Sequence, residues 1–230
     1  MSTNVIRLQE ILNYEFKQPT LAELALSHGS LSADRKDLPA GGNQRLELVG
    51  DAVIALVLAE TLYSQLPDAR EGALATMRSE LSRGEVLATC AQAIGLDQLL
   101  MVGSSEARHN PERTEAMLED ALEAVVGAVF LDGGYAAAAT VVRSLLEKEL
   151  SECTTEKARR NNPKGTLQEL AQSRDPEKLP VYATVAQEGP DHNKRYTVEV
   201  RLDGHMATGS GSSRKAAESA AAAAMLERLQ

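Results

Sequence analysis

Two pairs of acidic residues lie inside the most apolar stretches of this sequence. Glu47 and Asp51 are four residues apart in NQRLELVGDAVI, and Asp120 and Glu123 are three apart in EDALEAVVGAVFL. On a helix, residues at these spacings project from one face. Carboxylates on so apolar a helix are costly unless a cation lies between them. Two such pairs brought together would form an all-oxygen site suited to a hard cation such as Mg²⁺.

The same carboxylates have a simpler interpretation, as surface groups at the solvated edges of two helices. No Lys or Arg lies between the members of either pair or in the apolar residues that follow it. Gly127, one turn after Glu123, would allow another helix to pack closely there. These features favour a metal site, but the sequence pattern leaves both interpretations open.

A second group of residues suits anion binding. Ser212, Ser213, Arg214 and Lys215 stand at the start of the Ala-rich segment that ends the chain. At a helix N-terminus, hydroxyls, cations and free backbone N–H groups together attract phosphate. The alternative is a capping serine followed by two solvated cations.

The elements that must position these groups change in kind near residue 155. Residues 1–150 show apolar residues at three- and four-residue spacing, which predicts helices. The clearest helices are expected over Leu46–Leu66, Arg83–Ile94 and Glu115–Phe130. Glycine and proline breakers separate them, at Gly41-Gly42, Pro67, Gly95, Gly103 and Gly133-Gly134.

The remaining residues predict a small α+β domain of the order α-β-β-β-α, with its helices on one face of an antiparallel sheet. The expected elements are a helix over Thr166–Gln172, strands over Val181–Gln187, Arg195–Leu202 and His205–Gly209, and a helix over Ser213–Leu229. The sequence therefore predicts an all-α domain over residues 1–150, a polar linker over 151–161, and the α+β domain over 162–230.

Composition and charge agree with two domains that do different work. The net charge of the chain is −9, but it is unevenly distributed. Residues 159–230 hold 11 basic and 9 acidic residues, whereas the rest of the chain holds 13 basic and 24 acidic residues. An acidic body with a mildly basic appendage suits a metal-binding catalytic domain with an anion-binding module, or an acidic helical domain with an unrelated adaptor. No apolar run reaches the roughly 18 residues of a membrane span. We therefore expect a cytoplasmic protein without membrane contact.

Several motifs, in one order along nearly the whole chain, resemble the ribonuclease III family of bacterial type. NQRLELVGDAVI is similar to the family's signature, and LALSHGS at 24–30 is similar to the box before it. The C-terminal part resembles a double-stranded-RNA-binding domain. The other matching positions are Glu71-Gly72 with Met77-Arg78, Asp120 to Glu123 with Gly127, Pro163-Lys164, Leu167 to Glu169, Gly189 to His192, and Gly209 to Lys215.

This resemblance implies a helical endonuclease domain and hydrolysis of phosphodiester bonds in double-stranded RNA. Products would be 5′-phosphate and 3′-hydroxyl ends with two-nucleotide 3′ overhangs, in the processing of ribosomal RNA precursors and of some mRNA and tRNA precursors. Carried over by position, Glu47, Asp51, Asp120 and Glu123 would bind Mg²⁺, with Mn²⁺ as a substitute, and Asp51 and Glu123 would be catalytic. Glu71 would support the site or position the substrate.

The resemblance also implies the partners, which are double-stranded RNA and a second copy of the chain, with no small-molecule substrate. Gln168, Glu169 and His192 would contact the RNA minor grooves, and the Ser212–Lys215 segment would contact phosphates. Leu48, at a position where the family usually has Phe, would lie in the dimer interface.

One further departure concerns the acidic site. Gln44 stands where the family usually has Glu, so one acidic group near the site is neutral here. A catalytically inactive RNA-binding protein on the same fold is the alternative function, although it would be expected to lose the four carboxylates. A helical interaction protein with an appended adaptor explains neither the carboxylate pairs nor the Ser212–Lys215 segment.

Overall fold

The computed structural model describes residues 1–110, 112–154, 162–190 and 194–229. They divide into two compact units, one formed by Met1–Gln65 with Arg78–Glu152 and the other by Leu66–Met77 with Cys153–Gln230. The predicted linker over 151–161 lies largely outside the described residues, so the domain limits proposed from the sequence stay a prediction.

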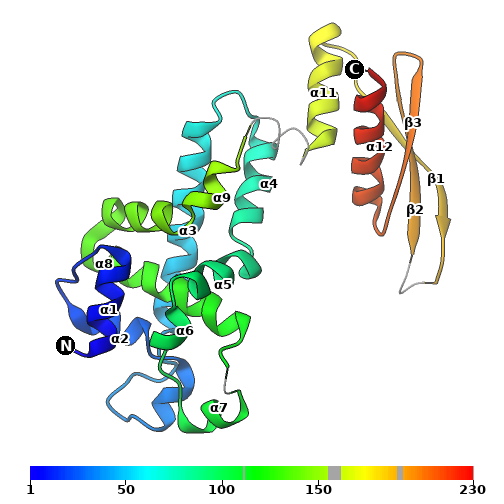
Figure 1. Cartoon of the computed structure of the whole chain (residues 1–230). Coiled ribbons are helices and arrows are strands. Elements are labelled where there is room, and N and C mark those ends of the chain that lie inside the picture. The colour runs from blue at the N-terminus through cyan, green and yellow to red at the C-terminus, as the bar shows by residue number, and fades with distance from the viewer. Residues whose placement is uncertain (111, 155–161, 191–193, 230) are drawn as a thin grey trace. The chain divides into compact units, whose positions relative to one another are not determined.

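The first unit is built from helices, as predicted. In Figure 1 it carries the blue, cyan and green segments. Helix α4 (Glu71–Leu81) runs from one unit into the other. The helices of the first unit are α1 (Thr3–Leu12), α2 (Pro19–Ala25), the short 3-10 helix η1 (Gly29–Ala33), α3 (Gln44–Gln65), α5 (Gly84–Ala93), α6 (Leu96–Leu99), α7 (Ser104–His109), α8 (Glu115–Leu145) and α9 (Glu147–Ser151).

Helix α8 is the central helix of this unit and packs most extensively on α3. It begins where Thr114 caps it, since the Thr114 hydroxyl accepts a hydrogen bond from the Met117 amide at 3.3 Å. The predicted break at Gly133-Gly134 is a kink, because Gly134 has φ 76° and the helix resumes after it. By length and composition α8 could cross a membrane, but its apolar window is mostly buried inside the unit, as in a core helix.

The second unit contains the predicted α-β-β-β-α order. Its elements are α11 (Pro163–Arg174), β1 (Val181–Glu188), β2 (Arg195–Leu202), β3 (His205–Gly211) and α12 (Arg214–Leu229). The strands form an antiparallel sheet in the order β1-β2-β3, with a register shift between Thr184 and Ala186. Helix α11 starts one turn earlier than predicted, because Asn162 caps it and Pro163 occupies its first position.

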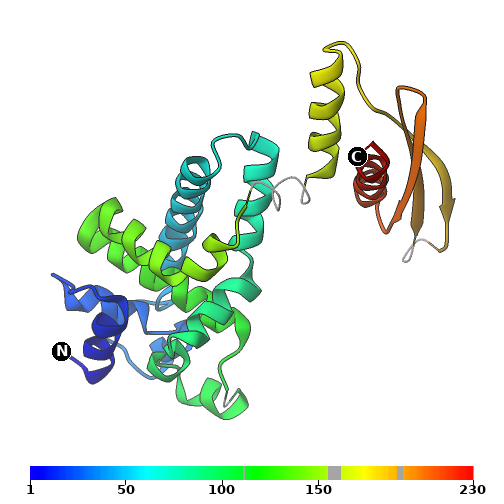
Figure 2. The same ribbon diagram turned by 45° about the horizontal axis from the view of Figure 1, so that its top comes forward.

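The composition of α12 follows from how closely it approaches the sheet. Both α11 and α12 lie on the same face of the sheet (Figures 1 and 2), with α12 packed on β2 and β3. At Gly209 a Cβ atom would lie 2.7 Å from the Ala221 Cα atom. So close a contact leaves room only for small side chains, which is why alanines fill the helix. The core of the unit is formed by Leu167, Ala171, Val198, Val200, Leu202, Ala207, Ala217, Ala221, Ala222 and Met225.

Candidate functional site

The two predicted carboxylate pairs are brought together where α3 crosses α8. At the crossing, a Cβ atom on Gly50 would overlap the carbonyl of Glu123, and one on Gly127 would lie 3.0 Å from the Leu46 carbonyl carbon. The two helices therefore touch backbone to backbone. The close approach expected of Gly127 is confirmed, and Gly50 is the matching residue on the other helix. We call Glu47, Asp51, Asp120 and Glu123, which flank these contacts, the acidic site.

The carboxylates of the acidic site are neither deeply buried nor fully solvated. Glu47, Asp120 and Glu123 are half-buried, and Asp51 is exposed. In the described part of the chain, none of the four forms an ion pair with Lys or Arg. The interpretation as carboxylates at a fully solvated helix edge therefore does not hold for three of the four.

The unbalanced charge is concentrated on Glu123. Burial, and then the charges of Asp51, Glu119, Glu47 and Asp120, raise the pKa of Glu123 to about 8. Without a cation, this carboxyl group is thus largely protonated at neutral pH. A group so placed releases a proton when a cation binds.

The other members of the acidic site show the same pattern more weakly. Burial, and then the charges of Asp120 and Glu119, raise the pKa of Glu47. Burial also raises the pKa of Asp120, against which nearby His28 acts in the opposite direction. The ring Nδ1 atom of His28 lies 2.8 Å from the Ser30 hydroxyl at the start of η1.

Glu119 belongs to this region although the sequence analysis did not select it. It is half-buried, and burial followed by the charges of Asp120 and Asp51 raises its pKa. Its spacing of four residues from Glu123 on α8 was the signal that could have identified it.

The donor set has the chemistry of a divalent-cation site. Carboxylate oxygens that are partly desolvated and repel one another suit Mg²⁺ or a similar hard ion. In their present rotamers, no three His, Cys, Asp or Glu side chains among the described residues are arranged to hold one ion. The backbone contact at Gly50 and Gly127 keeps the two carboxylate pairs close to each other, whereas side chains of this length turn readily.

The two residues expected to support the acidic site are placed differently. Gln44 is exposed at the first position of α3, and its side chain folds back over Gly41, where a Cβ atom would lie 3.6 Å from the Gln44 Cδ atom. Glu71 is exposed at the start of α4, in the segment that belongs to the second unit. A role for either residue in the acidic site stays a prediction.

Leu48 is not a core residue of the unit. Its side chain is 74% exposed on α3, and Leu56 and Tyr63 on the same helix are 56% and 74% exposed. These residues follow one another at intervals of eight and seven positions, which places them on one side of the helix. An exposed apolar stripe of this kind marks a surface available for association.

The residues expected to bind phosphate lie together at the start of α12. The Ser213 hydroxyl accepts a hydrogen bond from the Ala216 amide at 3.1 Å and so caps the helix. Ser212, Arg214 and Lys215 are exposed beside it. Ser213 is thus a capping serine, as one interpretation of the sequence had it. The exposed Arg214 and Lys215 still leave room for an anion, as the other interpretation requires.

The other expected RNA contacts are on α11 and in a loop. Gln168 is exposed on α11 and Glu169 beside it is half-buried. His192 lies outside the described residues, so its role stays a prediction.

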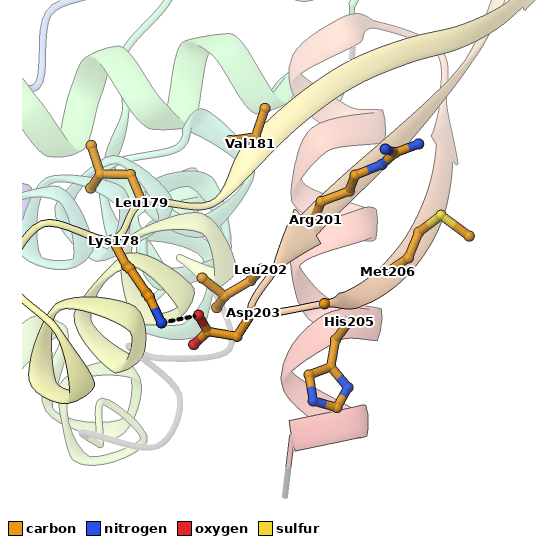
Figure 3. Close-up of a pocket in the computed structure, with 9 residues that line it drawn as sticks. Lys178, Leu179, Val181, Arg201, Leu202, Asp203, His205 and Met206 are labelled. Atoms are coloured by element: carbon orange, nitrogen blue, oxygen red, sulfur yellow. Dashed lines mark ion pairs between the residues drawn. The ribbon is translucent and has the colours of Figure 1, made fainter.

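A shallow pocket in the second unit lies away from these residues, at the start of β3 rather than at its end. Figure 3 shows that Lys178 and Asp203 approach each other across it, and their ion pair measures 2.7 Å. Exposed Leu179, Val181 and Met206 form its apolar part. No residue selected from the sequence lies in this pocket.

Comparisons with known proteins cover both units. A protein-family model described as ribonuclease-III-like matches residues 18–150, and one described as a double-stranded RNA binding motif matches residues 163–229. Two similar relatives are both named Ribonuclease 3. That of Oleidesulfovibrio alaskensis is 40% identical over 97% of both chains. That of Pseudomonas fluorescens is 40% identical over 100% of this chain and 97% of its own.

A solved structure agrees with these matches. The nuclease domain of ribonuclease III from Campylobacter jejuni is 31% identical, with a TM-score of 0.59, and covers 66% of this chain and 100% of its own. A second structure of that domain, 32% identical with a TM-score of 0.57 over 63% of this chain and 97% of its own, is described as showing flexibility in a region involved in dimer formation.

Proposed function

This chain belongs to the ribonuclease III family and is an endoribonuclease of double-stranded RNA, and we propose that its acidic site binds the divalent cations of that reaction. The observation that carries the proposal is the backbone contact at Gly50 and Gly127. It brings four carboxylates to one place in the described structure without a Lys or Arg partner. A catalytically inactive protein has no support, because all four carboxylates are present and the relatives are named as ribonucleases.

Glu47, Asp51, Asp120 and Glu123 would hold the cations, and Mg²⁺ fits an all-oxygen set of this kind, with Mn²⁺ as a substitute. A divalent cation would lower the pKa of its water and neutralise charge on the phosphate. Glu123 would release its proton when a cation binds and would then carry a full negative charge. Asp51 and Glu123, on the two helices that cross, would be the catalytic carboxylates. The products would carry 5′-phosphate and 3′-hydroxyl ends.

The start of α12 would bind the phosphates of the duplex. Arg214 and Lys215 are exposed cations at a capped helix N-terminus, where the helix dipole also favours anions. Exposed Gln168 on α11 would reach the minor groove, where double-stranded RNA displays its 2′-hydroxyls. Substituting Arg214 by Ala should weaken duplex binding about equally for all sequences and reduce the slope of affinity against salt by about one.

A second copy of the chain would cover the exposed apolar stripe of Leu48, Leu56 and Tyr63. The Campylobacter jejuni nuclease domain is described with a region involved in dimer formation, and a two-fold contact buries the same surface of both copies. Each copy would then supply one acidic site and cut one strand, which leaves two-nucleotide 3′ overhangs. We also propose that the enzyme processes ribosomal RNA precursors, and some mRNA and tRNA precursors, in the cytoplasm.

The decisive experiment uses a long perfect RNA duplex and the Glu123→Gln variant. The native protein should cut in Mg²⁺ and stop in EDTA. Glu123→Gln should cut more slowly by a factor on the order of 10³ and still bind the duplex. Glu115→Gln, an exposed position two turns earlier on α8, is the matched control and should cut normally. Near-native cutting by Glu123→Gln would remove the acidic site from the reaction.

Mixed dimers test the two-site arrangement. A dimer with one native and one Glu123→Gln subunit, purified through two different tags, should nick one strand and leave the other whole. Double-strand breaks at the native rate, or no nicking at all, would contradict an arrangement in which each subunit cuts one strand.

A further inference from the structure

A fifth carboxylate, that of Glu119, lies on α8 beside the acidic site. We propose that Glu119 is a positioning residue that strengthens cation binding by the acidic site without itself touching the substrate. The inference rests on the proposed function of the acidic site and adds a residue to it.

The place of Glu119 on α8 directs it toward the carboxylates. It precedes Asp120 by one residue and Glu123 by four, so Glu119 and Glu123 share a face of the helix. Unlike Glu115 one turn earlier, which is exposed, Glu119 is half-buried. Its charge raises the pKa of Glu47 on α3 and of Glu123 on α8, so it lies near carboxylates of both helices.

The carboxylate of Glu119 is confined by the first residue of α5. A Cβ atom on Gly84 would lie 2.7 Å from the Glu119 Cδ atom and 2.8 Å from its Oε1 atom. In this rotamer of Glu119, only a glycine leaves room for the carboxylate. The carboxylate thus lies against the backbone at the start of α5.

Glu119 has acidic neighbours and, among the described residues, no basic partner. It takes part in no ion pair in the described structure, and the side chains that act on its pKa are those of Asp120 and Asp51. A negative charge held close to other negative charges favours the arrival of a cation, since attraction is strong at reduced dielectric.

The first test measures cation binding and stability instead of cleavage. By titration calorimetry with Mg²⁺, Glu119→Gln should bind about tenfold more weakly than the native protein, the lower end of what supporting residues at metal sites contribute. In EDTA the same variant should melt about 2–4 °C higher, because one of the mutually repelling charges is gone. The exposed control Glu115→Gln should change neither quantity.

The second test moves the carboxylate and keeps its charge. Gly84→Ala places a methyl group where the carboxylate lies, and the flexible end of Glu119 can turn away. Mg²⁺ affinity should fall by severalfold. In the double variant Gly84→Ala with Glu119→Gln, affinity should be no lower than in Glu119→Gln alone, because both changes act on one carboxylate.

The outcomes separate this inference from the proposed function. Glu123→Gln should abolish the Mg²⁺ binding of the native protein. If it does not, or if the native protein binds no Mg²⁺, the acidic site is wrongly assigned and the role of Glu119 is lost with it. If the native protein binds Mg²⁺ and Glu119→Gln binds it equally well, the acidic site stands and Glu119 lies outside it. A lower melting temperature of Glu119→Gln in EDTA would show that the residue has a structural role only.

Discussion

Two carboxylates on α8, nine residues apart, have opposite surroundings. Glu123 lies at the crossing with α3 beside other carboxylates, and its pKa is raised to about 8. Asp132 is buried, with 8% of its surface exposed. Burial by itself would raise its pKa too, but hydrogen bonds from Tyr14, Lys17 and Gln18 outweigh burial and lower it.

The hydrogen bonds of Asp132 account for the difference. One oxygen accepts from the Tyr14 hydroxyl at 2.7 Å and the Lys17 amide at 2.9 Å, and the other accepts from the Gln18 amide at 2.8 Å. Burial, and then the hydrogen bond to Asp132, raise the pKa of Tyr14 to about 12. Asp132 thus joins the segment after α1 to the end of the long apolar run of α8.

The comparison shows how to tell a structural carboxylate from one that awaits a ligand. A buried charge that has its full set of donors stabilises the fold. A buried charge surrounded by other charges of the same sign destabilises the fold until a cation arrives. The more buried of the two carboxylates has the lowered pKa, so the supply of hydrogen-bond donors, and not burial alone, sets the direction of the shift.

The largest expected effect comes from separating the two helices at the crossing. Gly50→Ala places a methyl group against the carbonyl of Glu123, which belongs to the backbone and cannot turn away. We expect a loss of about 3 kcal/mol in the free energy of unfolding, measured with urea, and a large fall in duplex cleavage. Ser64→Ala, exposed near the end of α3 and outside the stripe of Leu48, Leu56 and Tyr63, is the control. Normal cleavage by Gly50→Ala would show that close approach does not form the acidic site.

A smaller effect on stability should come from removing the hydrogen bonds that Asp132 of α8 accepts. Asp132→Asn replaces one accepting oxygen by an amide group and leaves a donor without an acceptor, which costs about 2 kcal/mol. Tyr14→Phe removes only one of the three donors and should cost about 1 kcal/mol. Urea unfolding measures both. Mg²⁺ affinity should be unchanged in both variants, and weaker binding would mean that Asp132 serves the acidic site after all.

The smallest effect is the dependence of stability on pH in EDTA. The folded protein holds a proton on Glu123 between about pH 4 and about pH 8 that the unfolded chain has released, so stability falls as pH rises through this window. We expect a fall of about 1–2 kcal/mol after solvent screening. Asp132 has the opposite sign, because its stabilisation is present above the unfolded pKa and lost as pH falls through the lowered folded pKa.

Calorimetric melting in EDTA at pH 6 and pH 8 checks the first of these slopes. Glu123→Gln should show a much smaller difference between the two pH values than the native protein, and saturating Mg²⁺ should reduce the native difference. If the melting temperature of Glu123→Gln changes with pH as much as that of the native protein, the proton held by the folded protein belongs to another group.

Much of this arrangement could be predicted from the sequence, because local spacing determines it. The i,i+4 and i,i+3 carboxylates placed each pair on one helix face, and alternation placed β2 at Arg195–Leu202, where the structure has it. Gly127 indicated a close contact, although its partner Gly50 could not be chosen from the other glycines. The spacing of Glu119 was also visible, but spacing alone does not show which of several nearby acids faces the crossing.

The tertiary structure alone decided the surroundings of each acidic residue. Glu123 and Asp132 stand in the same apolar run, where only the nearby Asp120 sets Glu123 apart. The donors of Asp132 come from residues more than 110 positions away, and Glu47 and Asp51, which act on Glu123, come from the other helix at the crossing. The sequence determined which groups exist and which helix face carries them, because those depend on neighbours within one turn. Protonation and proximity depend on atoms brought together only by folding, so the surroundings of these carboxylates emerged with the packed structure.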